Sequence, residues 1–128
     1  MSVHQKISTP PVSGGAGMEV THKQLRRCDL VTVSGRIDAA TVKQLSDVLS
    51  EIKNAGRYNI VLNMKNVTYI SSAGLSELID TQNTCKQLNR GELVLAEVPD
   101  RIMDVLKLAG LTSLFKIFTT ETEAVGYF

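Results

Sequence analysis

Residues 67–75, VTYISSAGL, lie near the middle of the chain and determine how the sequence on either side is interpreted. Before them, residues 58–64 (YNIVLNM) form a short, largely apolar run, which is typical of a strand covered on both faces. After them, a stripe that is apolar except for Gln82 recurs at helical spacing: Leu75, Leu78, Ile79, Gln82, Cys85 and Leu88. The stretch therefore predicts a junction between a buried strand and an amphipathic helix, with two serines at the junction.

The rest of the chain alternates between strand-like and helix-like runs. Residues 19–25 and 30–34 are β-prone and are separated by a short polar segment, which predicts a hairpin. The full predicted order is β, β, α, β, α, β, α, β, α, with the last strand at residues 115–118. Strands separated by helices of about 10 to 15 residues indicate a parallel or mixed sheet with right-handed crossovers. We expect a small α/β domain with four to five strands.

Local signals predict where the helices begin and end. Thr41 is the expected N-cap of the first helix, and Gly56 is the expected stop. Pro99 is expected to start the third helix, and Thr120 with Glu123 predicts a capping box for a short terminal helix. Residues 35–40, between the hairpin and the first helix, are expected to form a loop.

The composition predicts one domain with a nearly neutral surface. The chain has 128 residues, of which 43% are hydrophobic but only 5% aromatic, so leucine, isoleucine and valine must build the core. Its 14 basic and 13 acidic residues give a net charge of +1, which argues against a direct nucleic-acid partner. Residues 1–17 are rich in Ser, Thr, Pro and Gly, so we expect a flexible tail over 1–17 and a single domain over 18–128.

No stretch approaches the roughly 20 consecutive apolar residues that a membrane span requires, and the first residues lack the apolar centre of a secretory signal. Cys28 and Cys85 are isolated, which favours small buried side chains in a reducing compartment. Together with His4 and His22 they have no metal-ligand spacing. We therefore expect a cytoplasmic protein without a membrane, metal or cofactor partner.

The motifs of common enzymes are absent from the sequence. It contains neither the GxxxxGK[ST] phosphate loop nor the GxSxG nucleophile elbow. Both histidines lie within the first 22 residues, so a base beside Ser72 would have to come from a peripheral segment. We expect a protein that is not an enzyme. A weak serine hydrolase, suggested only by an exposed serine, is the remaining catalytic alternative.

Ser71 and Ser72 allow two interpretations. A strand end followed by a helix start presents unpaired backbone N–H groups and the positive end of the helix dipole. One serine can act as an ordinary N-cap, but a cap needs only one hydroxyl. The other hydroxyl would be free at a place that favours anions, and its phosphorylation would add about −1.5 to −2 charges there. The two serines are therefore either cap chemistry alone or a cap beside a phosphorylation switch.

Three landmarks give the chain a resemblance to a known family. They are GRID at residues 35–38, the strand leading into SSAGL at residues 71–75, and LAGL at residues 108–111 followed by Phe115. Together they resemble a STAS domain, and within that superfamily the bacterial anti-sigma factor antagonists. The resemblance covers about residues 19–125, and the serine junction is its most specific part. It implies a mixed sheet with helices packed mainly on one face.

The resemblance also implies a function. Members of that family bind a serine-kinase anti-sigma factor and thereby free the sigma factor. The kinase phosphorylates a serine at the start of the second helix, which abolishes binding, and a metal-dependent serine phosphatase reverses the modification. By position, Ser72 is the implied phosphoacceptor, with Ser71 as the less favoured alternative. The implied partner-binding residues are Asp38, Thr41, Ser71, Ser72, Gly74, Leu75 and Leu78.

Two positions depart from the family pattern and keep an alternative open. Ser71 and Asn63 stand where the family often carries aspartate. Both departures remove a negative charge, which is compatible with altered kinase recognition or with phosphorylation of Ser71. They are also compatible with a STAS scaffold or adaptor subunit of another regulatory complex that has no phosphorylation cycle.

Overall fold

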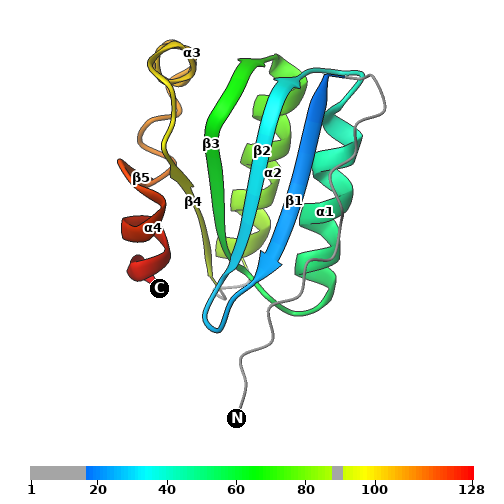
Figure 1. Ribbon diagram of the computed structural model, residues 1–128, viewed down its shortest axis with the longest axis vertical. Coiled ribbons are helices and arrows are strands. Elements are labelled where there is room, and N and C mark those ends of the chain that lie inside the picture. The colour runs from blue at the N-terminus through cyan, green and yellow to red at the C-terminus, as the bar shows by residue number, and fades with distance from the viewer. Residues whose placement is uncertain (1–16, 88–90) are drawn as a thin grey trace.

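The computed structural model describes residues 17–87 and 91–128, which form five strands and four helices (Figure 1). In chain order these are β1 (Met18–Gln24), β2 (Asp29–Ile37), α1 (Val42–Asn54), β3 (Asn59–Ile70), α2 (Ser72–Gln87), β4 (Glu92–Ala96), α3 (Asp100–Leu108), β5 (Ile117–Phe118) and α4 (Glu121–Tyr127). The order predicted from the sequence is confirmed. The predicted tail lies outside the described residues except for Gly17, whose carbonyl accepts a hydrogen bond of 2.9 Å from the Arg36 amide.

The strands form one mixed sheet in the order β1-β2-β3-β4-β5. β1 pairs antiparallel with β2, and every later pairing is parallel. The carboxyl ends of β2, β3, β4 and β5 therefore lie at one edge of the sheet, which we call the carboxyl edge. The start of every helix that follows a parallel strand lies at this edge, where ligands and partners of α/β proteins commonly bind.

The helices lie mainly on one face of the sheet, as expected. α1, α2 and α3 contribute to the main apolar core against that face, and Figure 1 shows α1 and α2 behind the strands. Alternate strand residues supply the other side of this core: Val20, Val31, Val33, Ile60, Leu62, Met64, Leu93 and Leu95. α4 packs on the opposite face through Ala124, against a smaller cluster that includes Val61, Val94 and Ala96. The central strands are therefore covered on both faces, which explains their nearly continuous apolar sequence.

Two strands are longer than predicted, and two are shorter. β3 continues from Asn59 to Ile70, because its second half pairs with the end of β2 up to the register of Ile37 with Ile70. The same pairing makes residues 35–37 part of β2, so the loop predicted at 35–40 is reduced to residues 38–41. The last strand contains only Ile117 and Phe118, which pair with Leu95 and Ala96, and the strand-like run at residues 92–98 is a strand only as far as Ala96.

The helix ends follow the predicted signals with two corrections. Gly56 has a positive φ of 82° just after α1, and Thr120 with Glu123 forms the predicted capping box of α4. Thr41 occupies the N-cap position of α1, but its side chain makes no capping hydrogen bond because it is used in the preceding loop. Pro99 is the N-cap of α3 and not its first helical residue, since its ψ of 152° is extended.

Both cysteines are buried and free, as the sequence predicts. Burial raises the pKa of the Cys28 thiol to about 11, with the Asp29 carboxylate as a further cause, and burial also raises the pKa of the Cys85 thiol to about 11. A raised thiol pKa favours the neutral, unreactive form. Within the described residues, no helix is both long and apolar enough to cross a bilayer.

We expect both thiols of the folded protein to react with a disulfide reagent at pH 8 at least about 100-fold more slowly than a free cysteine. The physical reason is the combination of burial with a thiolate fraction on the order of one in a thousand at that pH. Stopped-flow labelling with and without urea measures both rates. Rapid labelling of either thiol without urea would contradict the buried placement.

A buried ionic cluster closes the core at the end of the sheet opposite the carboxyl edge. The Asp29 carboxylate, whose side chain is 1% exposed, accepts hydrogen bonds from His22 Nε2 at 2.6 Å and from Arg57 Nε. The Arg57 guanidinium also donates to the carbonyl oxygens of Leu25 at 2.6 Å and Cys28 at 3.2 Å. The cluster ties the β1–β2 hairpin to the segment between α1 and β3.

Replacing Asp29 with alanine should destabilise the fold by about 3–5 kcal/mol, because Arg57 and His22 would lose their shared carboxylate in a buried place. Asp47→Ala is the matched control, since Asp47 pairs with Lys43 on the surface, where the two side chains are 64% and 82% exposed. That pair should contribute less than about 0.5 kcal/mol. Urea unfolding of the two variants gives the comparison. Equal losses of stability would show that the buried cluster has no special role.

Candidate functional site

Ser71 and Ser72 lie at the carboxyl edge, where β3 ends and α2 begins. The Ser71 amide donates to the carbonyl oxygen of Ile37 at 2.8 Å, which holds the junction against the end of β2. The Ser71 hydroxyl accepts a hydrogen bond from the Gly74 amide at 3.4 Å, and the Ser71 carbonyl accepts one from the Leu75 amide at 2.9 Å. Ser71 is therefore the residue that caps α2.

Ser72 is the first residue of α2, and its side chain is exposed. Because Ser71 already accepts hydrogen bonds from the amides of Gly74 and Leu75, the Ser72 hydroxyl is not needed for the cap. The amides of Ser72 and Ala73 have no acceptor within the helix, as is usual in a first turn. The Ser72 hydroxyl thus lies at a helix start with a favourable potential for negative charge.

The neighbouring loop between β2 and α1 is held by a network around Asp38 and Thr41. Asp38 Oδ1 accepts from the amides of Ala40 at 3.0 Å and Thr41 at 3.1 Å. The Thr41 hydroxyl donates to the carbonyl oxygen of Arg36 at 2.7 Å and accepts from the Asp38 amide at 2.9 Å. The loop is therefore a fixed turn whose shape depends on both side chains.

The charge of Asp38 is stabilised in this turn. Burial by itself would raise the pKa of the Asp38 carboxyl, but the hydrogen bonds from Ala40 and Thr41 and the charge of Arg36 outweigh it and lower the pKa below its usual value. The Asp38 side chain is 27% exposed, and its Oδ2 lies 3.6 Å from Arg36 Nε. Asp38 therefore presents a negative charge at the carboxyl edge throughout the neutral pH range.

Three of the predicted partner-binding residues have little or no exposed surface. Thr41 is 1% exposed and Leu78 is fully buried, and Gly74 is also buried in the first turn of α2. These residues support the site from beneath its surface, and their contact with a partner stays a prediction. Leu75 is partly buried and packs against the main core. The accessible part of the predicted surface consists of Asp38, Ser71, Ser72 and part of Leu75.

Gly74 allows α2 to approach the sheet closely. A Cβ at this position would lie 2.7 Å from Ile70 Cγ1 and 2.8 Å from Ile37 Cγ2. Both isoleucines are in strands, and their branched side chains have little freedom to move. The absence of a side chain at residue 74 thus allows the first turn of α2, which carries Ser72, to lie close to β2 and β3.

Gly74→Ala should destabilise the protein by about 1–3 kcal/mol, because the overlap outweighs the roughly 1 kcal/mol gained in helix propensity. The control is Gly126→Ala in α4, where an added Cβ meets nothing within 4 Å. That change should be neutral or stabilising by up to about 1 kcal/mol. Thermal or urea unfolding of both variants measures the difference, and a stabilised Gly74→Ala would contradict the close packing.

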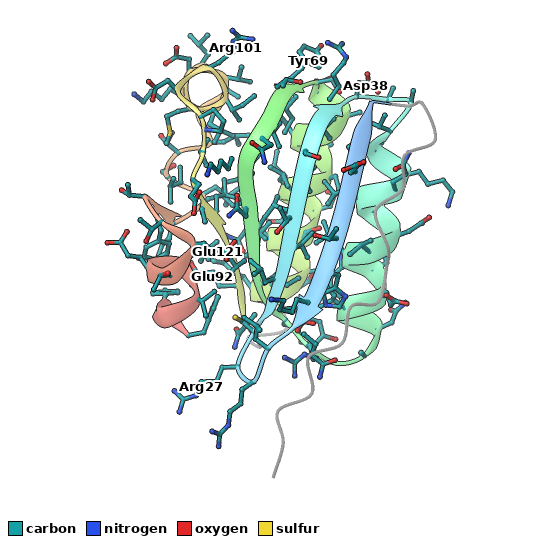
Figure 2. The ribbon with its side chains drawn as sticks, viewed as in Figure 1. Arg27, Asp38, Tyr69, Glu92, Arg101 and Glu121 are labelled. Carbon is teal, nitrogen blue, oxygen red and sulfur yellow. The ribbon has the colours of Figure 1, made fainter. Side chains whose placement is uncertain are left out.

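The structure adds two exposed residues that sequence reasoning missed. The Arg36 guanidinium lies over the Tyr69 ring, 4.2 Å from its centroid, and the Tyr69 side chain is 41% exposed. The two residues are paired in register across β2 and β3, next to the pair formed by Ile37 and Ile70. Figure 2 shows Tyr69 and Asp38 at the same end of the sheet. An exposed arginine–tyrosine stack is typical of residues that dominate protein interfaces.

Asn63 lies far from the serines and has a structural role. Its Nδ2 donates to Glu121 Oε1 at 2.7 Å, and its Oδ1 accepts from the Lys65 amide at 2.9 Å. An aspartate at residue 63 would place a second carboxylate against Glu121, which explains why asparagine fits here. Asn63 precedes Ser71 by eight residues of extended chain, a separation on the order of 20 Å.

The structure brings no catalytic or metal-binding group to Ser72 within the described residues. His22 pairs in register with Val31, which lies six residues before the end of β2 at Ile37, and its ring binds Asp29 at the start of that strand. Among the described residues, no group of three or more His, Cys, Asp or Glu side chains could hold a metal ion. The chemistry available at the junction is therefore that of an exposed hydroxyl beside a helix start.

Comparison with known proteins gives the family. The model of the STAS domain family matches residues 19–124. The anti-sigma-B factor antagonist of Staphylococcus aureus strain NCTC 8325 / PS 47 is 34% identical over 87 residues, which are 68% of this chain and 80% of that protein. The chain belongs to the STAS domain family, among relatives named as anti-sigma factor antagonists, as the sequence resemblance indicated.

Solved structures share the fold. An anti-sigma factor antagonist from Mycobacterium paratuberculosis superposes with a TM-score of 0.80 at 19% identity, covering 91% of this chain and 97% of that one. The Bacillus cell fate determinant SpoIIAA in its phosphorylated form gives a TM-score of 0.68 at 17% identity, covering 84% and 97% of the two chains. The five-stranded mixed sheet with four helices is therefore the fold of this family.

Proposed function

We propose that this chain is an anti-sigma factor antagonist that binds a serine-kinase anti-sigma factor while Ser72 is unphosphorylated. Phosphorylation of Ser72 by that kinase ends the binding, and a metal-dependent serine phosphatase restores it. The observation that carries the proposal is the division of roles at the junction: Ser71 caps α2, while the Ser72 hydroxyl is exposed and free. Family membership and the names of the relatives support the choice of partner.

The electrostatics of the carboxyl edge support a switch at Ser72. A phosphate at the first position of α2 would be stabilised by the helix dipole and by the first-turn amides, so the fold would tolerate it. The same phosphate would add about −1.5 to −2 charges at the edge that already carries the Asp38 carboxylate. A partner surface matched to Ser72 as a small neutral hydroxyl would then be repelled.

The alternative function, a STAS scaffold without a phosphorylation cycle, was suggested by Ser71 and Asn63. The placement of both residues weakens that alternative. Asn63 is used by Glu121 and Lys65 far from the junction, and the Ser71 hydroxyl performs the capping that an aspartate would also perform. Neither departure from the family pattern therefore removes the cap that holds the start of α2.

Affinity capture followed by phosphosite mapping tests the proposal. The wild-type chain is immobilised and exposed to lysate of its source organism in the presence of ADP, and the retained proteins are identified by mass spectrometry. We expect a protein with a serine-kinase domain. Incubation of the free chain with that protein and ATP should then give a single phosphate on Ser72. A phosphate on Ser71, or a large assembly without any kinase, would reject the proposed cycle.

A further inference from the structure

The second half of β3 has an unpaired edge. β4 pairs with β3 only up to the register of Asn63 with Ala96, whereas β2 pairs with β3 as far as Ile70. From Lys65 onward, β3 therefore has a strand neighbour on one side only. Figure 1 shows α3 near this part of β3, beyond the end of β4. The register of β3 with β2 shifts twice between Asn63 and Tyr69, so this edge is irregular, and only short stretches of its backbone are able to pair with another extended chain.

A groove lies along this edge. It has a cavity volume of about 360 Å³ and is lined by Lys65, Asn66, Val67, Thr68, Pro99 and Arg101. Pro99 gives it an apolar wall, and Val67 lies at its base with only 3% of its surface exposed, while Lys65, Asn66 and Thr68 are exposed. The groove is thus bounded by the free strand edge on one side and by the start of α3 on the other.

The charges of the groove have one sign. Lys65 and Arg101 are both exposed, and within residues 17–87 and 91–128 neither forms an ion pair. No carboxylate is among the lining residues. Figure 2 shows Arg101 at the same end of the molecule as Tyr69, the residue just before Ile70 on β3. The groove therefore complements negative charge.

We propose that this groove binds an extended acidic peptide segment, which pairs as a short strand with the free edge of β3 beyond Lys65, whose own amide is already bonded to Asn63 Oδ1. The backbone of the segment would pair with the β3 edge, as in other cases of strand addition. Its acidic side chains would meet Lys65 and Arg101, and a smaller apolar side chain would rest on Pro99. Neither Ser71 nor Ser72 is among the lining residues, so the site does not rest on the proposed phosphorylation cycle.

Nuclear magnetic resonance titration of the full ¹⁵N-labelled chain tests the inference. The probe is a capped hexapeptide of alternating glutamate and valine, and the comparison peptide has lysine in place of glutamate. We expect saturable shifts of the Asn66, Val67 and Thr68 amides with the acidic peptide only, together with slower hydrogen exchange of edge amides. No saturable shift at millimolar peptide, or equal shifts with the lysine peptide, would overturn the proposal.

Charge-reversal variants distinguish binding in the groove from non-specific electrostatic attraction of the peptide to the protein. Lys65→Glu and Arg101→Glu should each lower the affinity for the acidic peptide about three- to tenfold. Lys107→Glu, at an exposed position of α3 outside the lining residues, makes the same change in net charge and should leave binding unaltered. Equal weakening by all three variants would refute the site.

A different outcome would reveal another role for the cations. Lysines on free strand edges also prevent self-association. If Lys65→Ala forms oligomers while wild type binds no acidic peptide, Lys65 serves only to prevent self-association through the β3 edge, and the proposed site is wrong. Because the titration contains no anti-sigma factor, its failure leaves the proposal about Ser72 unaffected, and loss of the Ser72 switch leaves this groove unaffected.

Discussion

Replacing Ser72 with glutamate should weaken binding of the anti-sigma factor by at least about 100-fold, which corresponds to about 2.7 kcal/mol. The Ser72 side chain is exposed at the start of α2, so glutamate fits there without disturbing the cap made by Ser71. The loss comes from a new negative charge facing a surface adapted to a neutral hydroxyl. Isothermal titration with the captured kinase-type partner measures it.

Two further variants separate the switch from other effects. Ser72→Ala should keep wild-type affinity and resist inactivation by ATP and the kinase, because the hydroxyl acts as acceptor of phosphate and not as a cap. Asn83→Asp adds one negative charge at an exposed position of α2, about three helical turns from Ser72, and should change affinity less than about threefold. If Ser72→Glu binds as tightly as Asn83→Asp, the switch does not operate at Ser72.

Replacing Gly35 with alanine should cause the largest loss of stability among single substitutions at glycine, about 3–5 kcal/mol. Gly35 has a positive φ of 92°, and a Cβ would lie 1.9 Å from the carbonyl oxygen of Gly17. That carbonyl accepts the hydrogen bond from the Arg36 amide, so relieving the overlap would separate the start of β1 from the end of β2. Urea unfolding monitored by circular dichroism gives the free energy.

Gly56 provides a matched control for this substitution. It also has a positive φ, 82°, but an added Cβ would meet nothing within 4 Å. Gly56→Ala therefore reports the backbone strain alone, about 1–2 kcal/mol. The difference between the two variants isolates the close approach of Gly17 to Gly35. Equal losses would contradict the β1–β2 register around Gly35.

Sequence reasoning succeeded where the determining interactions are local. The element order follows from hydrophobic periodicity, and the Thr120–Glu123 capping box lies within one turn. The expectation that only one of the two serines is needed as a cap also holds, since Ser71 performs it. All these features depend on residues within a few positions of each other along the chain.

Features that depend on distant parts of the chain could not be read from the sequence. The length of β3 is set by its pairing with β2, and Arg36 meets Tyr69 only through that register. The ionic cluster joins Asp29 to Arg57, 28 residues later. Thr41 matched the pattern of an N-cap, but the fold directs its hydroxyl to the Arg36 carbonyl. In each case tertiary contacts decided between locally reasonable alternatives.

The site residues show the same division. The sequence left open which of the two serines caps α2, and in the structure Ser72 is exposed, whereas Leu78 and Gly74 are buried beneath the site. A helical stripe places Leu75 and Leu78 on one face without saying whether that face meets the sheet or a partner. Only the crossing of α2 over Ile37 and Ile70 decides this.

The most direct test of the central claim is the affinity of one preparation of the chain in two states. The chain is phosphorylated with its captured kinase and ATP, verified by mass spectrometry, and titrated against the anti-sigma factor with ADP. A portion is then dephosphorylated and titrated again. We expect no measurable binding in the phosphorylated state and full recovery after removal of the phosphate from Ser72. Equal affinity in the two states would contradict the proposed switch.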